Sequence, residues 1–324
     1  MNNGTLVISL DFELLWGVFD KVNWRDKTAY FERTRKLIPE LLQLFHKYDI
    51  HCTWATVGML FNENWDEWNA NIPECLPDYE NKNLSAYKYG KSIQSKETEK
   101  LCFAPNLVKL ITESKGQELG SHTYSHYYCL EPGQDSLAFK SDLEKSSELA
   151  SNHGVELKSL VFPRNQYNSD YLEICGKAGI EAVRTNPNNW YWKNTQKDSL
   201  IQKIFRTGDA YFGLLDKSYS SSQIQNFTKN ITGQKASRLL RPYSGRKILN
   251  SLKTKRIYRE MEYAAKMGQY YHLWWHPHNF GNNPNENLRE LESILIFYRK
   301  LKNKYAMQSL NMNELKTDHF EIKS

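Results

Sequence analysis

The chain has 324 residues, 40% hydrophobic and 25% charged, which is the composition of a globular protein with one large α/β domain or two smaller ones. Its net charge of +6 is spread without blocks of like charge, which argues against a nucleic-acid-binding surface. The five cysteines are odd in number and form no C-x-x-C pair, which argues against both a disulfide framework and a thiolate zinc site. No secretory signal and no run of about 18 apolar residues is evident, so we expect a cytoplasmic protein without a membrane span.

Short β-branched runs alternate with amphipathic stretches along the chain, which predicts an α/β protein with a mostly parallel sheet or barrel and helices outside. A strand is expected to begin at residue 117, and the other expected strands cover 5–12, 50–58, 157–162, 180–185 and 269–276. Expected helices cover 33–48, 106–116, 141–154, 169–179, 237–268 and 286–305. The chain shows neither a repeat nor a linker, so we expect a single domain over 1–324, with an insertion or long loop at about 61–103.

The first expected strand ends in two acids, in the sequence "LDFELLWG". Side chains two residues apart on a strand share a face, so Asp11 and Glu13 can point into one cavity while Phe12 faces the other way. Two close carboxylates repel each other unless a cation joins them. The alternative is that one acid caps a helix and the other lies on the surface.

Two histidines four residues apart, His122 and His126, follow the third strand in "GSHTYSH". On a helical turn this spacing places both imidazoles on one face, which suits a divalent metal. The pattern alone is common among nine histidines. Together with a carboxylate from the first strand end it predicts a site of two histidines and one carboxylate, the composition of many hydrolytic metal centres.

Two later strand ends also carry polar residues. Arg164 follows Pro163 in "LVFPRNQYN", and the last strand leads into "HLWWHPHNFG" with His272, His276 and His278. A histidine there can serve as a general acid, because its pKa permits proton donation near neutrality. A core role is favoured for His272 over the pair that flanks Pro277.

The segments "VISLDFE", "IHCTWATVGML", "GQELGSHTYSH", "FPRNQ" and "LWWHPH" resemble, in order and spacing, the motifs of polysaccharide deacetylases, the NodB-like domains of carbohydrate esterase family 4. The resemblance covers about residues 5–310. It implies a distorted (β/α) barrel, seven-stranded in this family's usual form. It also implies an enzyme that removes acetyl groups from N-acetylated sugars with a divalent metal, most often zinc, with cobalt or nickel as alternatives.

The resemblance also implies roles for single residues. Asp11 matches the catalytic base, His122 and His126 the metal-binding histidines, and His276 the general acid. Glu13 stands where a displaced third metal ligand would be, although Asp11 is an alternative ligand. The family's third motif has arginine before proline, whereas here Arg164 follows the proline; it is expected to orient Asp11 if it reaches that carboxylate.

Aromatic residues make up 13% of the chain, a high value that fits stacking against sugar rings. We expect substrate contacts from Trp16, Trp190, Trp275 and His278, with core packing as the alternative for each tryptophan. The expected partner is an N-acetylated carbohydrate, and a cytoplasmic location favours a nucleotide- or lipid-linked precursor over a finished polymer. The alternatives are a deformylase or other amidohydrolase of the same fold, and a non-catalytic glycan-binding module with a decayed site. The sequence carries no signal of an oligomeric state.

Overall fold

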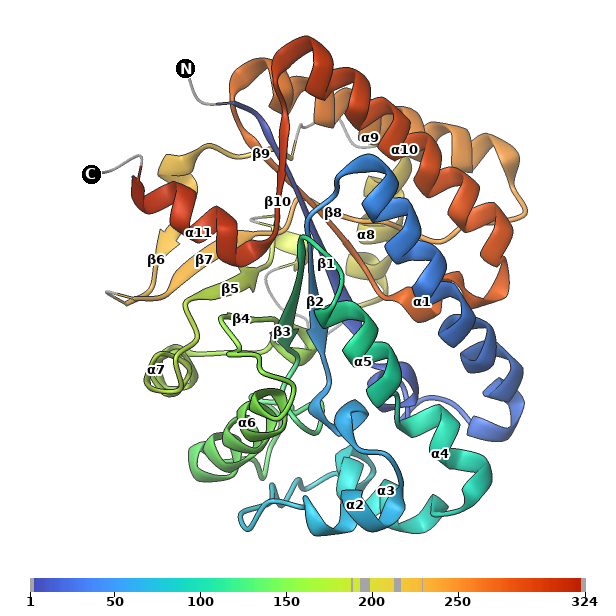
Figure 1. The fold of residues 1–324 in the computed structure, drawn as a ribbon, viewed down its shortest axis with the longest axis vertical. Coiled ribbons are helices and arrows are strands. Elements are labelled where there is room, and N and C mark those ends of the chain that lie inside the picture. The colour runs from blue at the N-terminus through green and yellow to red at the C-terminus, as the bar shows by residue number, and fades with distance from the viewer. Residues whose placement is uncertain (1–2, 188, 193–198, 213–216, 229, 322–324) are drawn as a thin grey trace.

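The computed structural model describes residues 3–187, 189–192, 199–212, 217–228 and 230–321, and it confirms the predicted fold class. A curled, mostly parallel sheet forms a half-barrel with helices around its outside (Figure 1). The strands in pairing order are β6 (Gln225–Asn226), β7 (Thr232–Lys235), β5 (Ala182–Thr185), β4 (Ser159–Leu160), β3 (Gln117–Ser121), β2 (Cys52–Thr56), β1 (Thr5–Phe12), β9 (Tyr270–Trp275) and β8 (Arg238–Leu239). In addition, β10 (Gln308–Leu310) pairs with the first half of β1.

The described strands number ten where seven were expected, because short pieces extend the sheet. The two-residue strands β6 and β8 lie at its edges and the three-residue β10 lies off the main path. Of the other seven strands, six lie where the sequence predicted a strand, and β7 is the seventh. Only β6 pairs in the antiparallel sense among the described strands. The parallel strands therefore present their carboxyl ends, and the loops that follow them, at one end of the half-barrel.

Helices connect the strands and cover the outer surface of the sheet (Figure 1). The longer ones are α1 (Thr28–Tyr48), α6 (Ser136–Ser151), α8 (Leu200–Phe212), α9 (Lys247–Met267), α10 (Pro284–Tyr305) and α11 (Met312–Glu321). The shorter ones are α2 (Trp65–Ala70), α3 (Ala86–Ile93), α4 (Lys96–Cys102), α5 (Pro105–Thr112) and α7 (Ser169–Lys177). None of the helices in the described ranges has the length and hydropathy required to cross a bilayer.

Alternation along β1 separates an outer core from the inside of the half-barrel. Leu6, Ile8 and Leu10 belong to the large core beneath the surrounding helices, whereas Val7 belongs to a second cluster that also contains Met312 of α11. Because side chains alternate along a strand, Asp11 points to the same side as Val7, the inside of the half-barrel. The alternation of side chains along β1 therefore places the Asp11 carboxylate inside the half-barrel.

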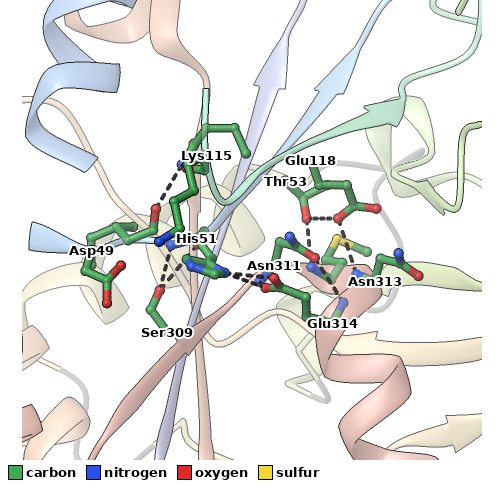
Figure 2. A network of polar contacts seen from close by, with 12 residues as sticks. Asp49, His51, Thr53, Lys115, Glu118, Ser309, Asn311, Asn313 and Glu314 are labelled. Atoms are coloured by element: carbon green, nitrogen blue, oxygen red, sulfur yellow. Dashed lines mark hydrogen bonds and ion pairs between the residues drawn. The ribbon is translucent and has the colours of Figure 1, made fainter. Parts of the chain in front are cut away.

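Polar contacts attach the C-terminal segment near the amino ends of β2 and β3 (Figure 2). His51, just before β2, lies 2.8 Å from the carboxylate of Glu314 through Nδ1. The backbone N–H of Met312 donates to Thr53 Oγ1 at 2.8 Å, and that of Asn313 donates to Glu118 Oε2 at 3.2 Å. These bonds hold α11 across this end of the half-barrel, where Met312 fills the interior.

Several expected elements differ from those observed. Residues 61–103 form α2, α3 and α4 and not one long loop, because their tryptophans and tyrosines pack into the core. The helix expected from residue 237 begins only at Lys247, since the chain first adds β8 to the edge of the sheet. Four further elements, α8, β7, β10 and α11, were not predicted from the sequence.

Candidate metal centre and catalytic site

The two acids at the end of β1 are both buried and both face the interior. Asp11 is 3% exposed and Glu13 2% exposed. His276 Nε2 lies 3.5 Å from Asp11 Oδ2 and 3.7 Å from Glu13 Oε1, so one imidazole faces both carboxylates. Leu14, directly after Glu13, has a positive φ of 44°, a strained backbone that turns the chain at the strand tip. The expected shared face is therefore observed.

His122 and His126 converge on one oxygen of Glu13. Their Nε2 atoms lie 3.3 Å and 3.2 Å from Glu13 Oε2. His122 Nδ1 lies 2.7 Å from the carbonyl oxygen of Val161, which can only accept, so the proton is on Nδ1 and the lone pair of Nε2 faces Glu13. His126 Nδ1 lies 3.1 Å from the hydroxyl of Tyr128.

The prediction of a helical turn between these two histidines is wrong. Residues 122–126 form a bent loop in which Thr123 and His126 have positive φ values of 62° and 57°. The buried carboxylate of Asp142 on α6 holds this loop by accepting from the backbone N–H groups of Tyr124 at 2.6 Å and Ser125 at 3.1 Å. Burial raises the pKa of Asp142 to about 6 even though these hydrogen bonds oppose the shift. Tertiary hydrogen bonds, and not helical periodicity, bring the two imidazoles together.

The residues Glu13, His122 and His126 fit a divalent metal. One ligand atom from each lies within 4.8 Å of the other two, and all three side chains are buried. Glu13 Oε2 is inaccessible to solvent and has no hydrogen-bond partner among the described residues. A buried carboxylate oxygen left without a donor is costly, and an ion between it and the nitrogen lone pairs would remove that cost. Two imidazoles and one carboxylate are a donor set typical of zinc and related ions.

Gly17 provides the space for the Glu13 side chain. A Cβ added at Gly17 would lie 1.9 Å from the carboxyl carbon of Glu13. We expect Gly17→Ala to displace that carboxylate and weaken zinc binding roughly ten- to a hundredfold, measured by competition with a chromogenic chelator. Gly245→Ala is the matched control, because a Cβ there meets nothing within 4 Å. Equal zinc affinity in both variants would contradict Glu13 as a ligand.

Arg184 on β5, and not Arg164, holds Asp11. Its Nη1 and Nη2 donate to the two carboxylate oxygens of Asp11 at 2.7 Å and 2.8 Å. Nη1 also donates to Ser9 Oγ at 3.0 Å, and the guanidinium lies 4.2 Å from the ring centre of Trp274. β5 is four places from β1 in the sheet, so the contact exists only because the half-barrel curls.

Arg164 lies on the other side of the metal-binding loop, which corrects the expected pairing with Asp11. Its guanidinium forms an ion pair with Asp20, lies 3.5 Å from Glu131 and stacks 4.1 Å from the ring centre of Tyr128. Arg164 thus packs on the tyrosine that contacts His126. The reversed Pro163-Arg164 order coincides with a positive φ of 53° at Arg164, which directs the side chain here.

The charges of the site keep both carboxyls ionised. Burial alone would raise the pKa of Asp11, but the positive charge of Arg184, and then that of His276, outweighs it and lowers the pKa. Burial also opposes ionisation of Glu13, but the electrostatic interaction with the neighbouring His276, followed by the close approach of His122 and His126, holds its pKa well below the usual value. Asp11 is therefore a paired carboxylate, whereas Glu13 is ionised with one oxygen free for an ion.

The two histidines after β9 occupy different environments. His276 is partly exposed, with 26% of its side chain accessible, and its Nδ1 lies 3.4 Å from Asn279 Nδ2. His278 is buried, and its Nδ1 lies 3.6 Å from Glu13 Oε1. This burial does not fit the expected contact of His278 with substrate and places it behind the Glu13 carboxylate. His272 is buried in the core, as the sequence favoured, and its Nε2 lies at hydrogen-bond distance, 2.8 Å, from Ser9 Oγ.

Two of the expected sugar-stacking tryptophans belong to the core. Trp16 has no exposed surface and stacks on Trp68 at 6.2 Å between ring centres. Trp275 likewise has none and stacks on Phe280 at 5.7 Å. Neither can offer a ring face to a sugar. Trp190, by contrast, is 50% exposed, as its polar sequence context indicated.

Buried histidines should make the metal-free protein acid-sensitive. Burial lowers the pKa of His126 and His278 to about 4 and that of His272 to about 3. In the unfolded chain these groups titrate near pH 6.5, so below that pH the unfolded chain binds more protons and acid favours unfolding. We expect the free energy of unfolding to keep its full value above pH 6.5. It should fall by about 1.4 kcal/mol per pH unit for each histidine as the pH falls towards about 4.

Urea titrations of chelator-treated protein between about pH 4.5 and 7.5 measure this slope. His272→Gln should reduce it by about a third, because one of the three neutral histidines is removed. A free energy of unfolding that stays constant below pH 6.5 would contradict neutral burial of these side chains.

Comparison with protein families identifies the chain. The family model of polysaccharide deacetylases matches residues 18–183, slightly more than half of the chain. The chain therefore belongs to the polysaccharide deacetylase family, as the motif resemblance indicated. The matched span contains His122 and His126, whereas Asp11, Glu13 and His276 lie outside it. Among curated proteins, none matches the sequence.

Solved structures share the fold at low sequence identity. A Mycobacterium smegmatis protein named as a polysaccharide deacetylase is 12% identical with a TM-score of 0.63, over 99% of this chain and 92% of that one. A Pseudomonas aeruginosa protein of the same name is 10% identical with a TM-score of 0.57, over 98% and 90%. The Puue allantoinase is 10% identical with a TM-score of 0.58, also over 98% and 90%. At these identities the similarity concerns the fold.

Proposed function

We propose that the chain is a metal-dependent N-deacetylase that hydrolyses the acetamide of an amino sugar in a polysaccharide or its precursor and releases acetate. The observation that carries this proposal is the convergence of Glu13, His122 and His126 beside the Asp11–Arg184 pair. Family membership supports the reaction class.

A divalent ion, most often zinc in such a donor set, would be held by Glu13, His122 and His126, and when bound it would lower the pKa of a water and polarise the amide carbonyl. The remaining chemistry belongs to two side chains. Asp11, kept ionised by Arg184, accepts a proton from the attacking water. Both oxygens of Asp11 accept hydrogen bonds from Arg184, whereas Glu13 Oε2 has no hydrogen-bond partner among the described residues. Glu13 is therefore assigned as the metal ligand and Asp11 as the base.

His276 is assigned as the general acid. Its Nε2 lies near both carboxylates, and its side chain is partly exposed, so it can reach a bound substrate. In its protonated form it donates from Nε2 to the amine nitrogen as the C–N bond breaks, and the free amine leaves together with acetate. The base and the acid thus lie on adjacent strand ends, β1 and β9.

A second candidate is an amidohydrolase of the same fold that acts on another amide. The fold that this chain shares with an allantoinase supports this second candidate, because one fold can carry different hydrolytic reactions. A panel of N-acetyl and N-formyl amino sugars and cyclic amides, assayed for acetate, formate and ring opening, separates the two. We expect zinc-loaded protein to release acetate from an N-acetyl sugar conjugate and chelator-treated protein to lose that activity.

Release of formate alone, or ring opening alone, would replace the proposal by the second candidate. A protein that binds the sugars without turnover and holds no stoichiometric metal would instead be a glycan-binding module. The cytoplasmic location and the nucleotide- or lipid-linked precursor stay predictions.

A further inference from the structure

An exposed apolar patch lies on α8 and the turn before it. We call it the α8 patch; it comprises Trp190, Leu200, Ile201, Ile204 and Phe205, which are between 50% and 73% exposed. The four helical residues recur at spacings of one, three and one, so they share one face of the helix. Trp190 extends this face, with its ring 5.1 Å from that of Phe205. Contiguous exposed apolar side chains of this size are unusual on a soluble surface and mark an interaction site.

The short helical segment that carries Trp190 of the α8 patch also contacts the catalytic site. Trp192, two residues after Trp190, lies 6.3 Å from the ring of Trp274. Trp274 in turn lies 5.7 Å from His276 and packs on Arg184. The segment Trp190–Trp192 therefore joins the patch to a ring that packs beside the group assigned as general acid.

Cations flank the same region. Arg241, in the "RPYSG" segment that follows β8, donates from Nη2 to the backbone oxygen of Arg206 on α8 at 3.2 Å. Within the described ranges no carboxylate pairs with Arg241. The preceding residue, Leu240, donates its backbone N–H to the oxygen of Trp274 at 2.8 Å, which places Arg241 next to the strand end that carries His276. Arg206 itself lies on α8, with its guanidinium 5.4 Å from the ring centre of Trp192.

We propose that the α8 patch docks on an anionic lipid bilayer, so that the site acts on an amino sugar attached to a membrane lipid. The choice of substrate rests on the proposed function, whereas the docking does not. An apolar helical face that enters the acyl boundary, with arginines at the level of the phosphates, is the arrangement of a peripheral membrane anchor. Arg206 and Arg241 beside the patch, on a chain of net charge +6, favour an anionic surface over a second copy of the chain.

Sedimentation with vesicles tests the docking without any turnover. We expect the full chain to bind vesicles of phosphatidylethanolamine and phosphatidylglycerol and to bind phosphatidylcholine vesicles at least about tenfold more weakly. Combined Ile201→Ser, Ile204→Ser and Phe205→Ser should lower binding to the anionic vesicles by about tenfold or more with an unchanged thermal melt, because these side chains are exposed. Arg241→Ser should weaken binding to the anionic vesicles only.

The matched control carries Leu137→Ser and Met267→Ser, two equally exposed apolar residues outside the patch. It should bind as the unchanged chain does. Failure of the unchanged chain to bind either vesicle, equal loss in the control, or a dimer in solution that the patch variant dissolves would each overturn the docking.

Activity separates this inference from the proposed function. The expected result is higher kcat/KM for an N-acetyl sugar on a polyprenyl diphosphate in anionic vesicles than for its nucleotide-linked form, with the advantage lost in the patch variant. Vesicle binding without acetate release would leave the docking intact and refute the deacetylase. Acetate release without vesicle binding would support the deacetylase and refute the docking.

Discussion

Asp11→Asn is expected to lower kcat for acetate release by about a hundred- to ten-thousandfold while the protein still binds one zinc ion. The amide keeps the size of the carboxylate but cannot accept the proton of water at neutral pH, and general base catalysis is of this magnitude. Zinc is retained because Glu13, His122 and His126 are untouched. Steady-state kinetics and metal analysis on the same preparation measure both quantities.

Glu13→Gln is the matched comparison, since it makes the same chemical change two residues along the chain. We expect it to lose zinc as well as activity, because its oxygen is the one that both imidazoles face. If Asp11→Asn lost zinc and Glu13→Gln kept it, the roles of base and ligand would be exchanged.

Arg184→Met should be the most damaging substitution away from the metal. It leaves Asp11 buried and without its partner, and removal of one member of a buried ion pair costs about 3–5 kcal/mol. The pKa of Asp11 should also rise, since burial would no longer be opposed by Arg184. Urea unfolding and the acidic limb of the kcat/KM profile measure the two effects, and the limb should shift to higher pH.

Arg164→Met provides the control for this prediction. Its guanidinium pairs with Asp20, so its loss should leave the acidic limb where it is in the unchanged chain. A shift of that limb in Arg164→Met, with none in Arg184→Met, would return Arg164 to the role that the motif order suggested.

Local sequence was sufficient to predict the residues that lie on strand ends. Asp11 and Glu13 follow from strand parity, and His122 and His126 from position and residue type, although the loop between them is not helical. Strand and helix alternation likewise predicted the half-barrel, because each unit buries its own apolar face.

Features that depend on the curl of the sheet could not be predicted in this way. Arg184 reaches Asp11 across the inside of the half-barrel, a contact between residues 173 positions apart. Trp16 follows the acids directly, yet α2 and α4 cover it, so sequence proximity to the site did not mean exposure. The one available signal for Arg184 was a charged residue next to the apolar pair Ala182-Val183 within the expected strand "IEAVRT".

The central claim is that one divalent ion binds between Glu13, His122 and His126, and anomalous diffraction at the zinc edge from crystals of the zinc-loaded protein tests it most directly. The account predicts a single strong peak about 2.0–2.2 Å from Glu13 Oε2 and from Nε2 of both histidines. A peak bound by Asp11 in place of Glu13, or no peak between the two imidazoles, would contradict it.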